Sequence, residues 1–229
     1  MTLNELIYDT LELVKANQIS DDVDIDARQI EFHWNTERAL LLREMLKKGS
    51  KIDSQIEQDF GCLDITEADA SECCTDTGCI LLRTSVKLPP LIDTDGKIGL
   101  TRVGPIDKLD LPFSIVSYDQ AQYSGEGKYT SNMAFIFILN GYLYIKTKNP
   151  QWELLGMINA RGIVENPSDL QTFNNCNTDA PCFSKDDTYP INGWMIPIIR
   201  DRILKRLGIT LQVPKDNSND ANDDATLKK

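Results

Sequence analysis

The spacing of apolar residues changes near Ser50, and this change constrains the fold more than any other feature. Before Ser50, apolar residues recur every three or four positions, which is the pattern of amphipathic helices. After it, apolar stretches are short and lie between turn residues, which is typical of strands. The chain has 229 residues, enough for one core with appended helices. We therefore expect an α+β fold.

Two helices are expected in the first fifty residues. Thr2-Leu3-Asn4-Glu5 has the spacing of a capping box, in which the threonine hydroxyl and the glutamate carboxylate bond the amides at a helix start. A second helix is predicted from Asp24 or Asp26 to Gly49. Its expected inward-facing residues are Ile30, Trp34, Leu41, Leu42 and Met45. We predict an N-terminal helical hairpin over residues 1–50.

The middle of the chain, residues 51–186, is predicted to be a β-rich body. Asn140-Gly141 lies between two apolar stretches, and this dipeptide readily adopts the positive φ angles of a type I′ turn. We therefore predict an antiparallel hairpin at this point. Further strands are expected within residues 79–86, 113–118 and 133–139.

A basic amphipathic helix is predicted within residues 187–210. Pro197 has no amide to donate, so it must lie in the first turn of this helix or kink it. The apolar residues of the segment are Trp194, Ile198, Ile199, Ile203, Leu204 and Leu207, followed by Gly208. Residues 211–229 are too poor in apolar side chains to offset their ordering entropy, so we expect a flexible polar tail.

The net charge of −11 disfavours two classes of partner. Nucleic-acid binding needs clustered Lys and Arg, and so does binding to an anionic membrane surface. The longest apolar run, residues 133–139, is too short for a membrane-spanning helix. The first residues also lack the basic region of a signal peptide. We expect no membrane association and no specific binding of DNA.

The charges are segregated along the chain, with acids but no Lys or Arg between Ile52 and Leu82, and with cations near the end. Opposite clusters on one chain suit contact between copies of it. The candidate interface residues are Glu67, Asp69 and Glu72 on the acidic side and Arg200, Arg202, Lys205 and Arg206 on the basic side. The basic cluster has two alternative roles: it forms a solvent-exposed helix face, or it binds an acidic protein partner.

The cysteines are the only candidates for a metal site. Four thiolates can hold a tetrahedral zinc ion, and the candidates are Cys62, Cys73, Cys74 and Cys79. Their spacing departs from paired zinc knuckles, and the surrounding carboxylates oppose thiolate formation. We therefore expect free thiols in a reducing compartment, with a disulfide between Cys176 and Cys182 as an option.

No catalytic motif accompanies these residues. His33 is the single histidine, which excludes two-histidine metal sites, and we expect it to be a packing or surface residue. The segment from Asp22 begins like a calcium loop, but Ala27 and His33 occupy the positions that need Gly and Glu. Phosphate-binding glycine motifs are also missing from the sequence. We expect no cofactor and no enzymatic activity.

Several stretches of the chain together resemble one family. They are Asp59-Phe60-Gly61-Cys62, Ser71-Glu72-Cys73-Cys74, Gly78-Cys79, Thr101-Arg102-Val103-Gly104-Pro105-Ile106-Asp107, Arg161-Gly162-Ile163-Val164-Glu165-Asn166-Pro167, Tyr189-Pro190-Ile191 and Asn217-Ser218-Asn219-Asp220-Ala221. With these stretches the chain resembles the virion structural proteins of crAss-like bacteriophages, and the resemblance extends from about Leu3 to Asp220.

The resemblance implies a subunit of the virion neck or tail, in a ring that connects the portal to the tail. Such rings are typically twelve-fold, carry no cofactor and let the genome pass through the lumen. They contact the portal and neighbouring rings, and they assemble in the cytoplasm of the bacterial host. The family has no active site to carry over to this chain.

The sequence is compatible with three other functions. The chain can belong to a tail or baseplate ring, or be a cargo protein packaged in the same virion. A small regulatory or hydrolytic protein organised by a cysteine-bound zinc is the second alternative. The third is an adhesin or carbohydrate-binding module that uses Trp152 in the β-rich middle.

Overall fold

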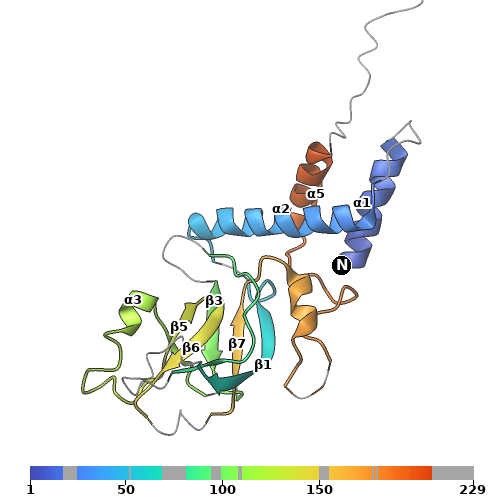
Figure 1. Cartoon of the computed structure of the whole chain (residues 1–229). Helices are drawn as coiled ribbons and strands as arrows, with labels where there is room; N and C mark the ends of the chain where they lie inside the picture. Colours follow the sequence, from blue (N-terminus) through green and yellow to red (C-terminus); the bar gives the residue numbers. More distant parts are fainter. Residues whose placement is uncertain are drawn as a thin grey trace, which may run out of the picture.

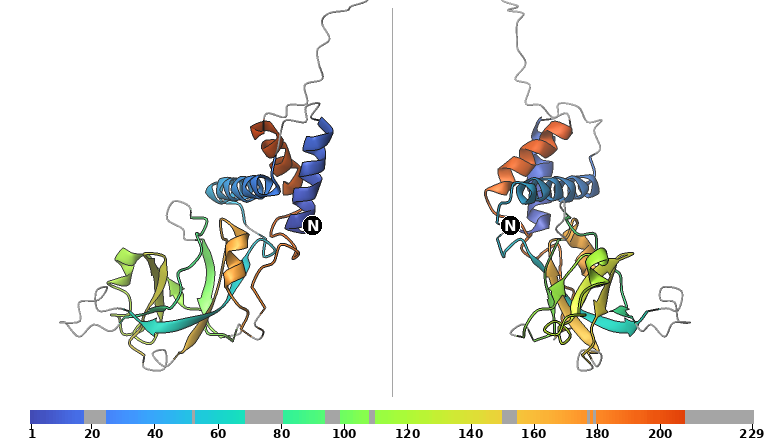
Figure 2. Two further views of the ribbon diagram at one scale, coloured as in Figure 1. Left: turned by 45° about the vertical axis from the view of Figure 1, so that its right-hand side comes forward. Right: turned by 90° about the vertical axis from the view of Figure 1, so that its left-hand side faces the viewer.

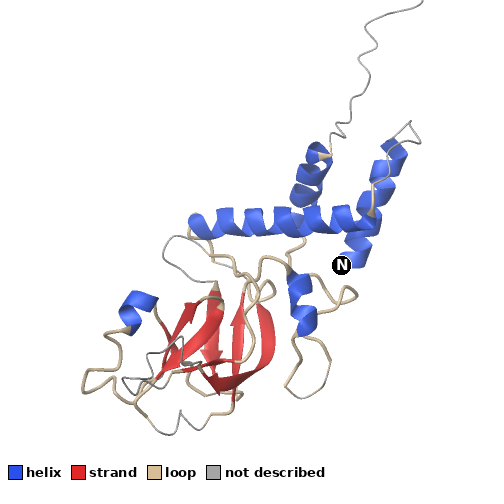
Figure 3. Ribbon diagram, in the orientation of Figure 1, coloured by secondary structure: helices blue, strands red, loops and turns tan. Residues whose placement is uncertain are grey.

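A computed structural model describes residues 1–17, 25–51, 53–68, 81–93, 99–107, 110–149, 155–176, 178 and 180–207. Three helices form a layer over one end of a curved sheet (Figures 1 and 3). They are α1 (Leu3–Asn17), α2 (Ala27–Lys47) and α5 (Met195–Arg206). The predicted α+β class agrees with this arrangement.

The predicted capping box is present at the start of α1. The backbone amide of Glu5 donates to Thr2 Oγ1 at 3.2 Å, and the amide of Thr2 donates to Glu5 Oε2 at 2.9 Å. Helix α2 follows Asp26, whose side chain makes no capping bond, and Gly49 adopts a φ of 72° just after its end. Both ends of α2 lie where the sequence predicts them.

Helices α1 and α5 both cross α2 steeply, so the helical layer is not a simple antiparallel hairpin (Figure 2). The indole of Trp34 in α2 is fully buried and donates to Thr10 Oγ1 of α1 at 3.0 Å. The predicted inward-facing residues of α2 are buried, except that Met45 is half-buried. The short connection between the first two helices, residues 18–24, lies outside the described part of the chain.

Helix α5 begins two residues before Pro197, which therefore lies in the first turn as predicted. Ile199 and Ile203 are fully buried. Trp194 is 51% exposed and Ile198 is 38% exposed, so not all apolar residues of this segment lie on the buried face of the helix. The crossing of α5 over α2 covers only a narrow stripe, and these two side chains fall outside it.

The sheet has seven strands in the order β3-β7-β1-β2-β6-β5-β4. All neighbours are antiparallel except β4 and β5. The amide of Phe113, just before β4, donates to the carbonyl of Val103 in β3 at 2.8 Å, so the sheet curls almost into a barrel. The strands are β1 (Gln58–Glu67), β2 (Leu82–Thr84), β3 (Leu100–Gly104), β4 (Ser114–Ile115), β5 (Phe135–Leu139), β6 (Tyr142–Lys146) and β7 (Met157–Gly162).

The hairpin at Asn140-Gly141 is confirmed. Asn140 has a φ of 53° and Gly141 a φ of 82°, and the ladder starts at the pair Leu139 and Tyr142. The other predicted strands are present but shorter than their apolar stretches, because β2 and β4 pair over only a few residues. Strands β1, β3 and β7 are not predicted from the sequence.

One apolar core runs from the helices into the sheet. It joins Leu6 and Trp34 of the helical layer to Phe60 and Ile158 of the sheet and to Ile199 of α5. Two short helices, α3 (Tyr118–Ala121) and η2 (Pro167–Thr172), lie in the connections. The helix and the sheet layers therefore support each other. The predicted polar tail and Gly208 lie outside the described residues.

Candidate assembly surfaces

The three arginines of the basic cluster of α5 face the other two helices. Arg200 Nη1 lies 2.9 Å from Asp9 Oδ2 of α1. Arg202 donates through both terminal nitrogens to the carboxylate of Glu44 in α2, at 3.2 and 3.0 Å. This hydrogen bond lowers the pKa of Glu44 and raises the pKa of Arg202. These arginines therefore hold α5 against α1 and α2.

Arg206 forms an ion pair with Glu37, a carboxylate that is only 2% exposed. The contact is close, but the guanidinium N–H does not point at the oxygen, so it is an ion pair rather than an aligned hydrogen bond. Arg202 also approaches Glu37, at 3.9 Å. A buried carboxylate without a nearby cation is strongly destabilising, so these arginines stabilise Glu37 in place.

The acidic side of the predicted charge pairing is only partly described. Glu67 is exposed at the end of β1, whereas Asp69 and Glu72 lie outside the described residues. Lys205 pairs with Asp201 on the same helix at 2.7 Å. Contact between the two clusters on neighbouring copies stays a prediction, and the intrachain partners of the three arginines weigh against it.

The cysteines are arranged differently from the prediction. Cys62 of β1 forms a disulfide with Cys176, so the expectation of free thiols is wrong for this pair. Cys182 does not bond Cys176, and its thiol instead lies 3.9 Å from Asn175 Oδ1. Among the residues that the structure describes, no three metal-binding side chains cluster. The other zinc candidates, Cys73, Cys74 and Cys79, lie outside that part of the chain.

A bulge in β1 explains this pairing. Gly61 has a φ of 69°, and the carbonyl oxygen of Asn174 lies 2.0 Å from the position that a Cβ would take. The segment after η2 therefore packs directly on β1, next to Cys62. Asn159 of β7 donates to Asp59 Oδ1 at 2.6 Å and fixes the other side of the bulge. Cys62 and Cys176 are 114 residues apart in the sequence, so no local pattern predicts the contact between them.

His33 is half-buried on α2 and meets the ring of Phe32 edge-on, with 5.7 Å between the ring centroids. This arrangement fits the predicted packing role. No helix within the described ranges is both long and apolar enough to cross a membrane.

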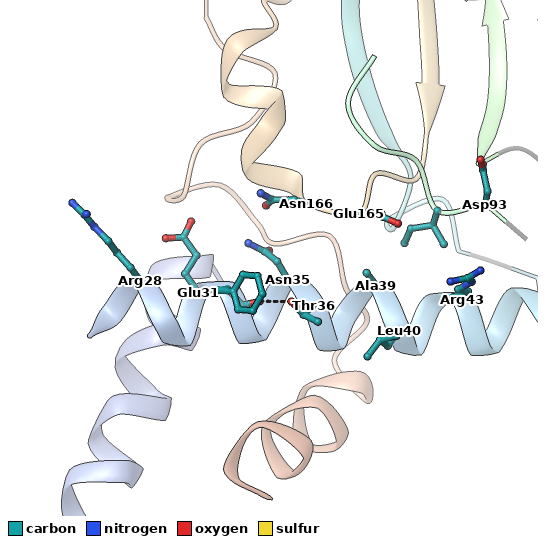
Figure 4. A pocket seen from close by; sticks show the side chains of 12 residues that line it. Arg28, Glu31, Asn35, Thr36, Ala39, Leu40, Arg43, Asp93, Glu165 and Asn166 are labelled. Atoms are coloured by element: carbon teal, nitrogen blue, oxygen red, sulfur yellow. Dashed lines mark hydrogen bonds between the residues drawn. The ribbon is translucent and has the colours of Figure 1, made fainter. Parts of the chain in front are cut away.

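A groove with a volume of about 470 Å³ runs along α2, between this helix and the sheet domain (Figure 4). One wall consists of α2 residues three or four positions apart. The opposite wall comes from the loop before β3 and the segment after β7. The lining residues are Arg28, Glu31, Phe32, Asn35, Thr36, Ala39, Leu40, Arg43, Ile92, Asp93, Glu165 and Asn166.

The groove side of α2 lies roughly opposite the side that packs on α1 and α5. Trp34 and Glu37 face the other helices, whereas Phe32 and Leu40 face the groove. Phe32 is 65% exposed and Leu40 is 38% exposed, so the single chain leaves apolar surface open to water. The groove is not predicted from the sequence, although apolar residues on two sides of one helix are a signal for it.

The chain belongs to a family of bacteriophage ring proteins. The family model that matches, described as Phage tail ring protein 2, covers residues 5–225, so the chain belongs to this family. It is also 30% identical over 229 residues to Ring protein 2 of Bacteroides phage crAss001, with 98% of each chain covered. The resemblance to structural proteins of crAss-like phages is thereby confirmed. The chain is a structural ring protein of a phage virion.

Proposed function

We propose that the chain is the subunit of a non-enzymatic, homo-oligomeric ring in the virion neck, which connects the portal to the tail. The observation that carries this proposal is the family match over nearly the whole chain, from residue 5 to residue 225. The buried charged contacts described above hold the subunit itself together.

The ring is proposed to be twelve-fold, with the portal and other neck or tail rings as its neighbours and with assembly in the host cytoplasm. The genome passes through the lumen without specific binding. The net charge of −11 supports this part, because a strongly acidic protein repels the phosphate backbone. A position in the tail or baseplate, or as packaged cargo, would leave the same fold with different neighbours.

Mass measurement of the purified full-length chain under native conditions tests ring formation. We expect one closed species of about twelve copies, in addition to free subunits. A chain that stays monomeric at every concentration and salt level contradicts the proposal. Image reconstruction of the virion then distinguishes a neck ring from a tail or baseplate ring by its position.

A double charge reversal in the same experiment tests the predicted contact between clusters. Arg200→Glu with Asp9→Arg keeps the ion pair inside the chain but reverses the charge that α5 shows to a neighbour. If Arg200 also contacts the acidic stretch of another copy, the reversed chain forms rings only at higher protein concentration. Unchanged ring formation at low salt would leave Arg200 with its intrachain role alone.

A further inference from the structure

We propose that the groove along α2 binds the uncharged start, residues 208–214, of the C-terminal segment (residues 208–229) of a neighbouring copy in the ring. This inference rests on the proposed function, because it needs copies of the chain side by side. A contact in a closed ring joins two different surfaces, which are here the groove of one copy and the C-terminal segment of the next.

The shape of the groove suits an extended peptide. Its α2 wall runs from Arg28 to Arg43, which is about 22 Å at the rise per residue of an α-helix. An extended chain covers this distance with about six or seven residues. A compact ligand of the same volume would leave the ends of the groove empty.

The open apolar surface of the groove calls for an apolar partner. Phe32 and Leu40 are exposed in the single chain, and two further apolar residues line the groove, Ala39 on the α2 wall and Ile92 on the opposite wall. Covering such side chains removes apolar area from water and favours association. Asp93 and Glu165 stand on the opposite wall, so a partner here must be uncharged or carry its acids elsewhere.

The start of the C-terminal segment has this chemistry. Ile209, Leu211 and Val213 alternate with polar or small residues, so an extended conformation places all three on one side. No charged residue occurs before Lys215. The uncharged stretch 208–214 is seven residues long, which matches the length of the groove.

The charges beyond this stretch fit the ends of the groove. Arg28 and Arg43 are exposed, one at each end, and neither forms an ion pair with any residue that the structure describes. The segment after Pro214 carries Asp216 and, further on, Asp220, Asp223 and Asp224. One of these arginines therefore lies within reach of acids that follow the apolar stretch.

Geometry and the family match favour a neighbour's segment over the chain's own. Helix α5 ends on the side of the helical layer that points away from the sheet, whereas the groove lies between α2 and the sheet (Figures 1 and 4). The family model continues from Leu207, the last described residue, through residue 225. A segment that belongs to the family pattern and follows a helix end on the far side of the helical layer is suited to reach the next subunit.

Photocrosslinking in the full-length chain tests the inference. A benzophenone amino acid replaces Leu40 in the groove, and the matched control carries it at Tyr8, which is 71% exposed on α1. Chains labelled with heavy nitrogen carry the probe and are mixed with unlabelled chains. We expect crosslinks from position 40, but not from position 8, to residues 208–229 of unlabelled chains. Crosslinks to any other segment, or only within one chain, overturn the inference.

A pair of substitutions in the segment gives a second readout. Leu211→Asp places a charge in the apolar stretch and is expected to raise the concentration needed for assembly by about tenfold or more. Leu227→Asp, outside that stretch, is expected to leave it unchanged. Equal effects of the two substitutions contradict the inference. Rings that form without crosslinks to residues 208–229 would refute the inference alone, whereas a failure of the unsubstituted chain to form rings would refute the proposed function.

Discussion

Arg38 is the most deeply buried charge in the described part of the molecule. Its side chain is fully buried, and it donates through Nε to the carbonyl of Pro190 at 3.0 Å and through Nη1 to the carbonyl of Val164 at 2.8 Å. The guanidinium also lies 5.7 Å from the centre of the Tyr189 ring. Burial lowers the pKa of Arg38 to about 10, which leaves it charged at neutral pH. It joins α2 to the end of the sheet and to the segment before α5.

We expect Arg38→Ala to lower the free energy of unfolding by about 3 kcal/mol, because it leaves two buried carbonyls unpaired and opens a cavity. Denaturant unfolding measures the change. Arg43→Ala on the exposed side of the same helix is the matched control and should change stability by less than about 0.5 kcal/mol. Similar losses in both variants would show that Arg38 has no special role.

At the scale of elements, the glycine bulge of β1 determines how the segment 173–182 packs. The positive φ of Gly61 and the close carbonyl of Asn174 leave no room for a side chain. The amide of Cys182 donates to Phe173 at 2.7 Å, and the amide of Cys62 donates to Asn174 at 3.3 Å, so the segment is held from both sides.

Gly61→Ala is expected to destabilise the fold by about 2 to 4 kcal/mol and to expose residues 173–182 to protease, because the new Cβ must displace Asn174. Thermal unfolding and limited proteolysis followed by mass spectrometry check both effects. Gly156→Ala is the matched control, since nothing lies within 4 Å of its Cβ position. Protection of the segment in both variants would contradict this account.

The sequence predicted those elements whose signals are local. The capping box of α1 and the turn at Asn140-Gly141 each depend on residues within a few positions, and both are present. Strand β1 was missed because Asp59, Gly61 and Asp64 interrupt its apolar pattern. Asp59 and Gly61 are accommodated in a central strand because Asn159 of the neighbouring β7 donates to Asp59 Oδ1 and to the carbonyl of Gly61. That partner is 100 residues away from Asp59 and carries no local signal.

The candidate groove could be predicted only in part, for the same reason. Its α2 wall follows from helical spacing, but its second wall comes from Ile92 and Glu165, which only the tertiary fold brings close. The basic cluster of α5 was predicted as a cluster, whereas its partners Asp9 and Glu44 depend on how the helices cross.

At the scale of the whole molecule, net charge determines the interaction with DNA. Assembled rings of a chain with a charge of −11 are expected to retain no duplex DNA, even at low salt where such binding is strongest. A filter-retention assay across salt concentrations measures this, with free subunits as the control for effects of assembly. Retention that weakens as salt rises would reveal a basic lumen and contradict the proposed passage without binding.

The disulfide between Cys62 and Cys176 links the first strand of the sheet to a segment beyond the last, 114 residues away. The strands β2 to β7 all lie between these two cysteines in the sequence. A pulling force applied at the chain ends would therefore run through this bond and bypass most of the sheet. Under tension, the helices would separate first, and the enclosed strands would keep their order until the bond broke.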